Sequence, residues 1–230
     1  MSIEKVHVTF THCLKAFNSI LILFVASLAS RAADNLVVGD FSLGVDAYGV
    51  PTGWHLREKS GKADFSVVRA EGTHALQLRS SATSYSFQRE IKADLSQYPI
   101  LSWKWKVTKL PEGGDFRRSK TDDQAAQLFV AFSRTQTIVY IWDTSVPQGF
   151  MGDAPAPPLM SIKAVVVRST PTEAGRWLTE TRNVYEDYKN LFGVTDNPPP
   201  VSGMRIQINS QHTKSSAESY FADVVFKKRA

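Results

Sequence analysis

Apolar and polar residues alternate with a period of two through much of this 230-residue chain. The clearest segment is ILSWKWKVT, residues 100–108, whose two alternating sets are Leu101, Trp103, Trp105 and Val107, and Ser102, Lys104, Lys106 and Thr108. Successive side chains of a β-strand point to opposite faces, so the segment predicts a strand with its tryptophans in a core and its lysines in solvent. An alternative interpretation places the Ser/Lys face in a cleft, where it would meet an acidic or hydroxylated ligand.

Further runs of this kind, bounded by turn residues, predict further strands. They lie at 65–69, 75–80, 85–91, 127–133, 138–143, 163–168, 204–209 and 219–227, and Gly175 and Trp177 open another strand that ends near Asn183. The segment PQGFMGDAPAPP, residues 147–158, is too rich in Pro and Gly to be a strand. Such a series of short strands predicts an all-β domain, a β-sandwich, over residues 33–230.

One helix is predicted over residues 184–192. Asn183 can cap its first turn, and Glu186 sits three residues on, where its side chain can reach back to the cap. Aromatic and aliphatic residues recur at helical spacing in between, and Gly193 ends the helix.

The first 32 residues differ from the rest and predict a secretory signal peptide. Lys5 and Lys15 lie in a basic start, ILILFVASLA at 20–29 is a short apolar run, and Ser30-Arg31-Ala32 offers a cleavage site. The run is shorter than the roughly 20 residues that a membrane span needs. The alternative is a signal anchor that stays uncleaved. With cleavage, we expect a bacterial periplasmic or secreted protein without a membrane span.

Cysteine and charge restrict the function classes. Cys13 is the only cysteine and would leave with the signal peptide, which excludes disulfides, thiolate zinc sites and a cysteine nucleophile in the mature chain. The formal net charge of +5 is too small to indicate a nucleic-acid partner. The histidines His55, His74 and His212 match no helical metal motif.

The carboxylates offer candidate chemistry but no catalytic pair. Asp122 and Asp123 end a polar loop, and adjacent strand positions face opposite ways, so they are not expected to form one paired site. One of them would face a cleft and accept hydrogen bonds from ligand hydroxyls or bind a metal; the alternative is a solvated loop end. A glycosidase needs two carboxylates roughly 5 to 10 Å apart, and no spacing here ties two together. No catalytic residue is therefore predicted.

Two stretches offer other ligand contacts. Tyr140, Trp142 and Phe150, near the Pro-rich loop, predict an aromatic platform for sugar rings; the alternative is that Tyr140 and Trp142 belong to a stripe of the core. Arg205 and Gln207 lie on the polar face of the strand at 204–209.

A first resemblance is carried by NLVVGDF followed by GW at the start, ALQLRS in the middle and SYFADVVF at the end. These segments resemble a jelly-roll sandwich of the galactose-binding type, the fold of many carbohydrate-binding modules. The resemblance implies that the first and last strands lie near each other. It also implies that an acidic residue from each, here Asp40 and Asp223, binds a structural calcium; the alternative is two strand-end aspartates bonded to nearby amides.

A second resemblance covers nearly the whole chain after residue 32. YPILSWKWKV, the LPEGGD loop, DDQAAQLFVAF, IVYIWD, GRWLTETRNVYEDYKNLFG and SSAESYFADVVF are similar to a bacterial family classed only as domain of unknown function 3047. That family has no established activity, so the resemblance supports fold and export more than function. Where an acidic pair is expected after the next-to-last strand, this chain has Asn209-Ser210-Gln211-His212, which puts metal or acid chemistry there in question.

Together these observations predict an exported, non-catalytic binding module for carbohydrate, with a polysaccharide or envelope glycan as its partner. The alternatives are a polysaccharide-acting hydrolase or lyase, and a structural or partner-binding envelope protein. The predicted ligand-binding residues are Lys104, Lys106, Asp122, Asp123, Tyr140, Trp142, Arg205 and Gln207. The predicted metal ligands are Asp40 and Asp223, and calcium is the one cofactor considered.

Overall fold

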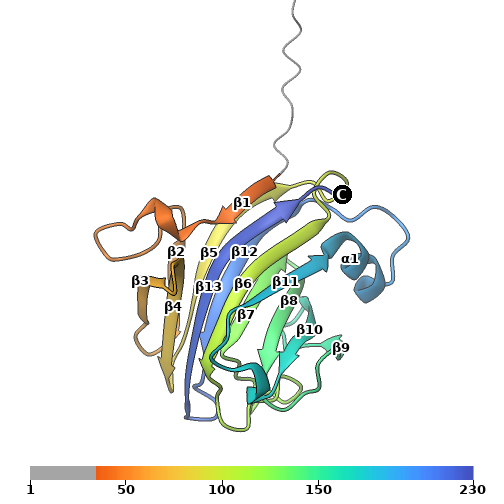
Figure 1. Cartoon of the computed structure of the whole chain (residues 1–230). Coiled ribbons are helices and arrows are strands. Elements are labelled where there is room, and N and C mark those ends of the chain that lie inside the picture. The colour runs from red at the N-terminus through yellow and green to blue at the C-terminus, as the bar shows by residue number, and fades with distance from the viewer. Residues whose placement is uncertain (1–34, 230) are drawn as a thin grey trace, which may run out of the picture. The chain divides into compact units, whose positions relative to one another are not determined.

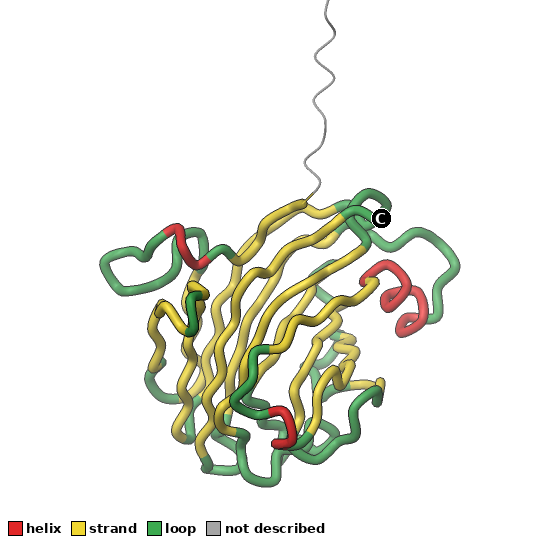
Figure 2. Tube along the Cα trace, in the orientation of Figure 1, coloured by secondary structure: helices red, strands yellow, loops and turns green. Residues whose placement is uncertain are grey.

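Two β-sheets packed face to face make up residues 35–229, the part of the chain that the computed structural model describes (Figure 1). The signal peptide predicted over residues 1–32 lies outside the described residues. The β-sandwich predicted from the alternating pattern is confirmed, as is the jelly-roll type that the first resemblance implied. Figure 2 shows that the helical segments are short and lie at the ends of strands.

The six-stranded sheet has the order β11-β6-β13-β4-β3, and β1 also pairs with β13. The bounds are β1 Asn35–Gly39, β3 Asp64–Ala70, β4 Thr73–Ser81, β6 Ile100–Lys109, β11 Leu178–Asn183 and β13 Ser216–Lys227. The first and last strands therefore pair directly, in antiparallel register, as the first resemblance implied. β13 pairs with β4 through its first half and with β1 through its second half, and its register is shifted around Asp223.

The seven-stranded sheet has the order β2-β5-β12-β7-β8-β10-β9. The bounds are β2 His55–Ser60, β5 Ser84–Ala93, β7 Ala126–Ala131, β8 Gln136–Asp143, β9 Met151–Asp153, β10 Ser161–Ser169 and β12 Val201–Asn209. Its pairs are antiparallel except β8 with β10, which run parallel. The short strand β9 lies inside the segment 147–158, for which no strand was predicted. It forms because a Pro-free stretch at the sheet edge pairs with β10.

Aromatic side chains fill the space between the sheets. Trp103 and Trp105 of β6 are fully buried, which confirms the face predicted for them. The Trp103 ring lies 5.3 Å from that of Tyr140, and the Trp105 ring lies 5.8 Å from that of Trp142, so β6 packs directly across β8. This core contact joins the central part of one sheet to the other.

The predicted helix is present as α1, Val184–Phe192. The Asn183 side chain accepts a hydrogen bond from the Glu186 backbone N–H at 3.2 Å, and Gly193 adopts the left-handed conformation that ends the helix (φ 65°). Tyr188 packs on Phe132 beyond the end of β7, with ring centroids 4.5 Å apart. Within residues 35–229, no helix has the length and apolar character required to cross a membrane. Two 3-10 turns, η1 (Phe41–Leu43) and η2 (Pro171–Glu173), complete the elements described.

Candidate functional site

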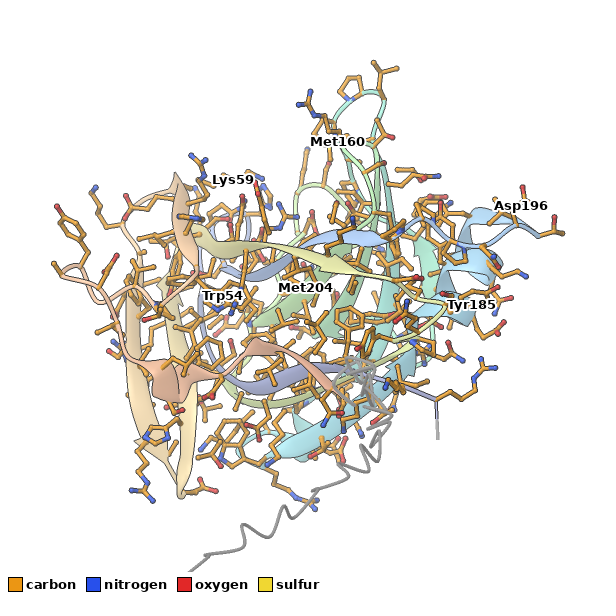
Figure 3. The ribbon with its side chains drawn as sticks, turned by 90° about the horizontal axis from the view of Figure 1, so that it is seen from above. Trp54, Lys59, Met160, Tyr185, Asp196 and Met204 are labelled. Carbon is orange, nitrogen blue, oxygen red and sulfur yellow. The ribbon has the colours of Figure 1, made fainter. Side chains whose placement is uncertain are left out.

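A groove lies on the outer face of the seven-stranded sheet, away from the core. It consists of two adjoining cavities of about 330 and 290 Å³, which share Phe129, Met160, Ile162 and Arg205 as lining residues. Each cavity is near the lower end of the range known for small-ligand sites. Figure 3 shows Lys59 and Met160 on this outer side of the sheet, with Trp54 and Met204 on the core side.

The strand register places the outward-facing side chains of this sheet in two rows, most of whose members line the groove. The first row runs His55, Gln88, Arg205, Phe129, Val139 and Ala164. The second row runs Arg57, Ser86, Gln207, Gln127, Ile141 and Val166. Both rows are polar on β2, β5 and β12 and become apolar on β8 and β10. The groove therefore has one polar half and one apolar half.

The apolar half is a second hydrophobic cluster outside the main core. It forms because β8 and β10 are apolar on both faces, as in IVYIW and AVVV, which is typical of parallel strands covered on both sides. Here the loop 154–160 provides the cover, with Pro155, Pro157 and Met160 lining the cavity beside β10. This loop forms one wall of the groove.

Asn209, at the end of β12, holds the polar end of the groove in place. Its side-chain oxygen accepts hydrogen bonds from the Gln124 backbone N–H at 2.9 Å and from the Gln127 amide at 2.5 Å. Its amide nitrogen donates to the Asp122 carbonyl oxygen at 2.6 Å. Asn209 stands where an acidic residue was expected, and it serves here to orient neighbouring groups.

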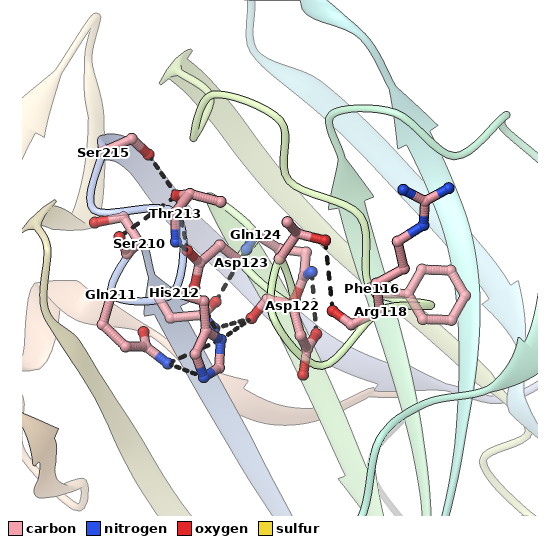
Figure 4. A network of polar contacts seen from close by, with 12 residues as sticks. Phe116, Arg118, Asp122, Asp123, Gln124, Ser210, Gln211, His212, Thr213 and Ser215 are labelled. Carbon is pink, nitrogen blue, oxygen red and sulfur yellow. Dashed lines mark hydrogen bonds and ion pairs between the residues drawn. The ribbon is translucent and has the colours of Figure 1, made fainter.

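Asp122 and Asp123 face different surroundings, as their adjacent positions predicted (Figure 4). Asp123 is fully buried and accepts hydrogen bonds from the Thr213 N–H at 2.6 Å and the Thr213 hydroxyl at 2.8 Å, so it anchors the loop after β12. Asp122 lines the groove and accepts a hydrogen bond from the Gln124 amide at 3.2 Å. Only Asp122 of this pair is placed to meet a ligand.

The environment of Asp122 favours its neutral form. Desolvation in the half-buried groove raises the pKa of its carboxyl to about 6, although the Gln124 hydrogen bond and the nearby His212 act in the opposite direction. At neutral pH the carboxylate is therefore held ionised in surroundings that disfavour the charge.

We expect Asp122→Asn to stabilise the protein at neutral pH. Because its pKa is raised in the folded state, the contribution of Asp122 to wild-type stability is highest below about pH 4 and is lost as the pH rises through about 6. The variant lacks that fall, so above pH 7 its free energy of unfolding should exceed that of wild type by about 1–3 kcal/mol. Urea denaturation at pH 4 and pH 7.5 measures this. A gap between the two proteins that does not change with pH would contradict it.

Lys104 and Lys106 lie away from the groove, on the outer face of the six-stranded sheet. Lys104 pairs with Asp223 at 2.8 Å and Lys106 pairs with Glu71 at 2.9 Å. The Lys106 ammonium also lies 4.7 Å from the centre of the Tyr220 ring. The structure therefore does not bring these lysines together with Arg205 and Gln207, because β6 and β12 belong to different sheets.

Tyr140 and Trp142 lie in the core, so the aromatic platform predicted for sugar rings is wrong at these positions. Both are fully buried. The Tyr140 hydroxyl donates to Asp187 at 2.8 Å and the Trp142 indole N–H donates to the Thr170 carbonyl at 3.1 Å. Their alternation along β8 marks the core face, and the groove takes the other face.

Asp40 and Asp223 each lie one residue from a paired position of the first and last strands, since Gly39 pairs with Val224. Asp40 accepts hydrogen bonds from the N–H and hydroxyl of Ser42 at 2.9 and 2.6 Å, while Asp223 pairs with Lys104. In the described part of the chain, no group of three or more His, Cys, Asp or Glu side chains is placed to hold a metal. The calcium site stays a prediction.

The sequence interpretation missed several groove residues. They are Arg57, Lys59, Gln88, Gln124, Gln127, Phe129 and Met160. The sequence pattern could have placed Gln127 and Phe129 on the outer face of their strand, because they alternate with the core residues Leu128 and Val130. None existed for β2, because HLREKS is too polar to indicate a strand by its apolar period.

The chain belongs to the family described as "Protein of unknown function (DUF3047)", whose model matches residues 52–225. A search of the curated proteins finds no match.

Among solved structures, the chain is similar to the xyloglucanase domain of NopAA, a type three effector from Sinorhizobium fredii, with 10% identity, 77% of this chain and 94% of that chain covered, and a TM-score of 0.47. It is also similar to the endoglucanase cel12A from Rhodothermus marinus, with 8% identity and a TM-score of 0.46. The match covers 85% of this chain and 99% of that chain. A third similar structure is the family 11 carbohydrate-binding module of the cellulase Lic26A-Cel5E of Clostridium thermocellum, with 11% identity and a TM-score of 0.44. The match covers 86% of this chain and 96% of that chain. These are likenesses of fold alone.

Proposed function

We propose that this member of the DUF3047 family is a glycan-binding protein that holds a sugar chain in the groove on its seven-stranded sheet. The observation that carries the proposal is the division of the groove into a polar and an apolar half by the strand register. Sugars present both hydroxyls and apolar C–H faces, so a site for them needs both kinds of surface.

The polar half is rich in side-chain amides. Those that line the groove are Gln88, Gln124, Gln127 and Gln207. An amide offers donors and an acceptor together, which suits hydroxyl groups that themselves donate and accept. The Gln127 amide is already oriented by Asn209 and the Gln124 amide by Asp122, so their remaining hydrogen-bonding capacity is directed without further loss of side-chain freedom.

The apolar half supplies a surface for the C–H face of a sugar ring. Phe129 lies in the middle of the first row, between Arg205 on β12 and Val139 on β8. The loop 154–160 extends this surface through Met160 and two prolines. Rigid proline and packed aromatic groups lose little conformational freedom when a ligand binds.

The proposal includes export to the bacterial periplasm or exterior, where polysaccharide and envelope glycans are met. Its support is the signal peptide predicted over residues 1–32.

A second candidate is an enzyme acting on polysaccharide, and Asp122 is the observation that favours it. A carboxyl with a pKa of about 6 that lines a groove has the property required of a general acid. The other carboxyl lining the described groove is Glu90, in the other cavity. Release of reducing ends or unsaturated products from a bound polysaccharide, lost in Asp122→Asn, would favour this candidate over simple binding.

We expect Gln207→Ala to weaken glycan binding about three- to tenfold, because it removes one groove hydrogen bond of ordinary strength. A glycan array with neutral and acidic members identifies the ligand, and titration calorimetry with it gives the affinities. Gln77→Ala is the matched control, since Gln77 is a half-buried glutamine on the outer face of the other sheet.

Failure to bind neutral and acidic glycans alike would overturn the proposal. If Gln77→Ala lost more glycan affinity than Gln207→Ala, the binding site would be on the six-stranded sheet instead.

A further inference from the structure

We infer that the groove selects acidic glycans and that Arg205 binds the carboxylate of a uronic-acid unit, an inference that rests on the proposed function. Arg205 comes from β12, in the interior of the seven-stranded sheet, and its side chain lines both cavities of the groove. It is therefore placed where a sugar chain that spans the two cavities would pass.

The guanidinium of Arg205 is held flat and shielded but is left without an anion. Its central carbon lies 3.5 Å from the centre of the Phe129 ring, directly across the strand pair. Its Nε is shielded from solvent and has no hydrogen-bond partner. Among the described residues, no carboxylate lies within ion-pair distance of it.

Three other half-buried arginines in the described part of the chain have acidic partners, whereas a fourth, Arg89, donates to the Val38 carbonyl. Arg168 binds Glu180 through its Nε at 2.8 Å, and Arg182 binds Asp187 through its Nε at 2.9 Å. Arg79 likewise binds Asp64 through its Nε at 3.0 Å. Arg205 differs from these arginines because it faces the groove, and it lacks the partner that they have.

Without an acidic partner, nothing offsets the effect of burial on the pKa of Arg205. Desolvation by the groove walls lowers the pKa of Arg205 to about 10, so the site disfavours the charge that it nonetheless carries at neutral pH. A bound anion would compensate for that cost. Because the guanidinium is planar and lies over a ring, it presents donors in one plane, which can bind both oxygens of a carboxylate at once.

The surrounding charges favour an anion as well. Arg57 and Lys59 of β2 line the same groove and are exposed, while Glu90 and Asp122 are the carboxyls that line it. With Arg205 the groove has three cationic side chains against two carboxyls in its described lining, since the Arg89 guanidinium donates to the Val38 carbonyl on the other side of the sheet.

The test compares polygalacturonate, a polymer of uronic acid, with the same polymer after chemical reduction of its carboxyl groups to alcohols. Affinities are measured by affinity electrophoresis and calorimetry on wild type, Arg205→Gln and Arg69→Gln. Arg69 is an exposed arginine of β3 in the other sheet, so its variant loses the same charge away from the groove. Thermal melts verify that each variant is folded, and Lys59→Gln, which changes an exposed side chain of the same groove, serves as a second groove variant.

We expect wild type to bind the uronate polymer about 10- to 100-fold more tightly than the reduced polymer, the range of a hydrogen bond to a charged group. Arg205→Gln should lose that preference and keep the affinity for the reduced polymer, Lys59→Gln should reduce the preference, and Arg69→Gln should leave it unchanged. Equal binding of both polymers by wild type would overturn the inference and leave glycan binding in place. Tighter binding of sulfated dextran than of polygalacturonate would overturn the assignment to a carboxylate, and failure of every glycan would overturn the proposed function too.

Discussion

Trp103→Ala should lower the free energy of unfolding by about 3–5 kcal/mol, the range found when a large buried aromatic side chain is truncated. Trp103 is fully buried, and its ring lies 5.3 Å from both Trp105 and Tyr140, so it contacts its own strand neighbour and the opposite sheet. Removing it opens a cavity between the sheets that these aromatic rings are too constrained to fill. Urea denaturation of wild type and variant, monitored by circular dichroism, measures the loss.

Lys104→Ala is the matched control, one residue along the same strand and on the opposite face. Its side chain is 40% exposed and pairs with Asp223, which is 55% exposed. Exposed ion pairs contribute about 0–1 kcal/mol, so the change should be small. If both variants lost the same free energy of unfolding, the two faces of β6 would be assigned wrongly.

Asp187→Ala should lower the free energy of unfolding by about 3–5 kcal/mol, because it leaves a half-buried guanidinium and a buried tyrosine hydroxyl without their shared partner. Its carboxylate is 8% exposed and binds the Arg182 guanidinium through both oxygens, at 2.9 and 2.5 Å. It also accepts the hydrogen bond from the Tyr140 hydroxyl, which is inside the core. Without Asp187, both Arg182 and Tyr140 lose their partner.

Glu186→Ala provides the comparison, since Glu186 precedes Asp187 on α1 and its side chain is 50% exposed. We expect a change within about 0.5 kcal/mol, as for an exposed site. Tyr140→Phe should fall between the two, at about 1–2 kcal/mol, because it removes the hydroxyl and leaves the ion pair intact. An Asp187→Ala loss no larger than that of Glu186→Ala would mean that the ion pair does not stabilise the fold.

Local pattern predicted most of the elements correctly. The alternation in LSWKWKV defined both faces of β6, and Asn183 and Gly193 marked the two ends of α1. These predictions succeeded because the signals act over a few residues: a strand has a period of two, and caps satisfy the ends of their own helix. The pattern failed at β2 and β9, short edge strands whose pairing with a neighbour replaces an apolar period.

The candidate site was predicted only in part. Arg205, Gln207 and Asp122 lie in the groove, whereas Lys104 and Lys106 lie on the other sheet and Tyr140 and Trp142 lie in the core. The polar face of any strand is a candidate for binding by its sequence alone. Only the sheet to which a strand belongs shows which polar faces are neighbours.

The sequence by itself determined which side chains share a face within each strand and where α1 begins and ends, because backbone geometry relates residues that are close along the chain. The tertiary structure alone decided the order of the strands, and with it the groove. Gln127 and Gln207 are neighbours because β7 pairs with β12, and Arg205 meets Phe129 for the same reason. Such pairing is specified by the packing of whole sheets over a common core, so no short stretch of the chain records it.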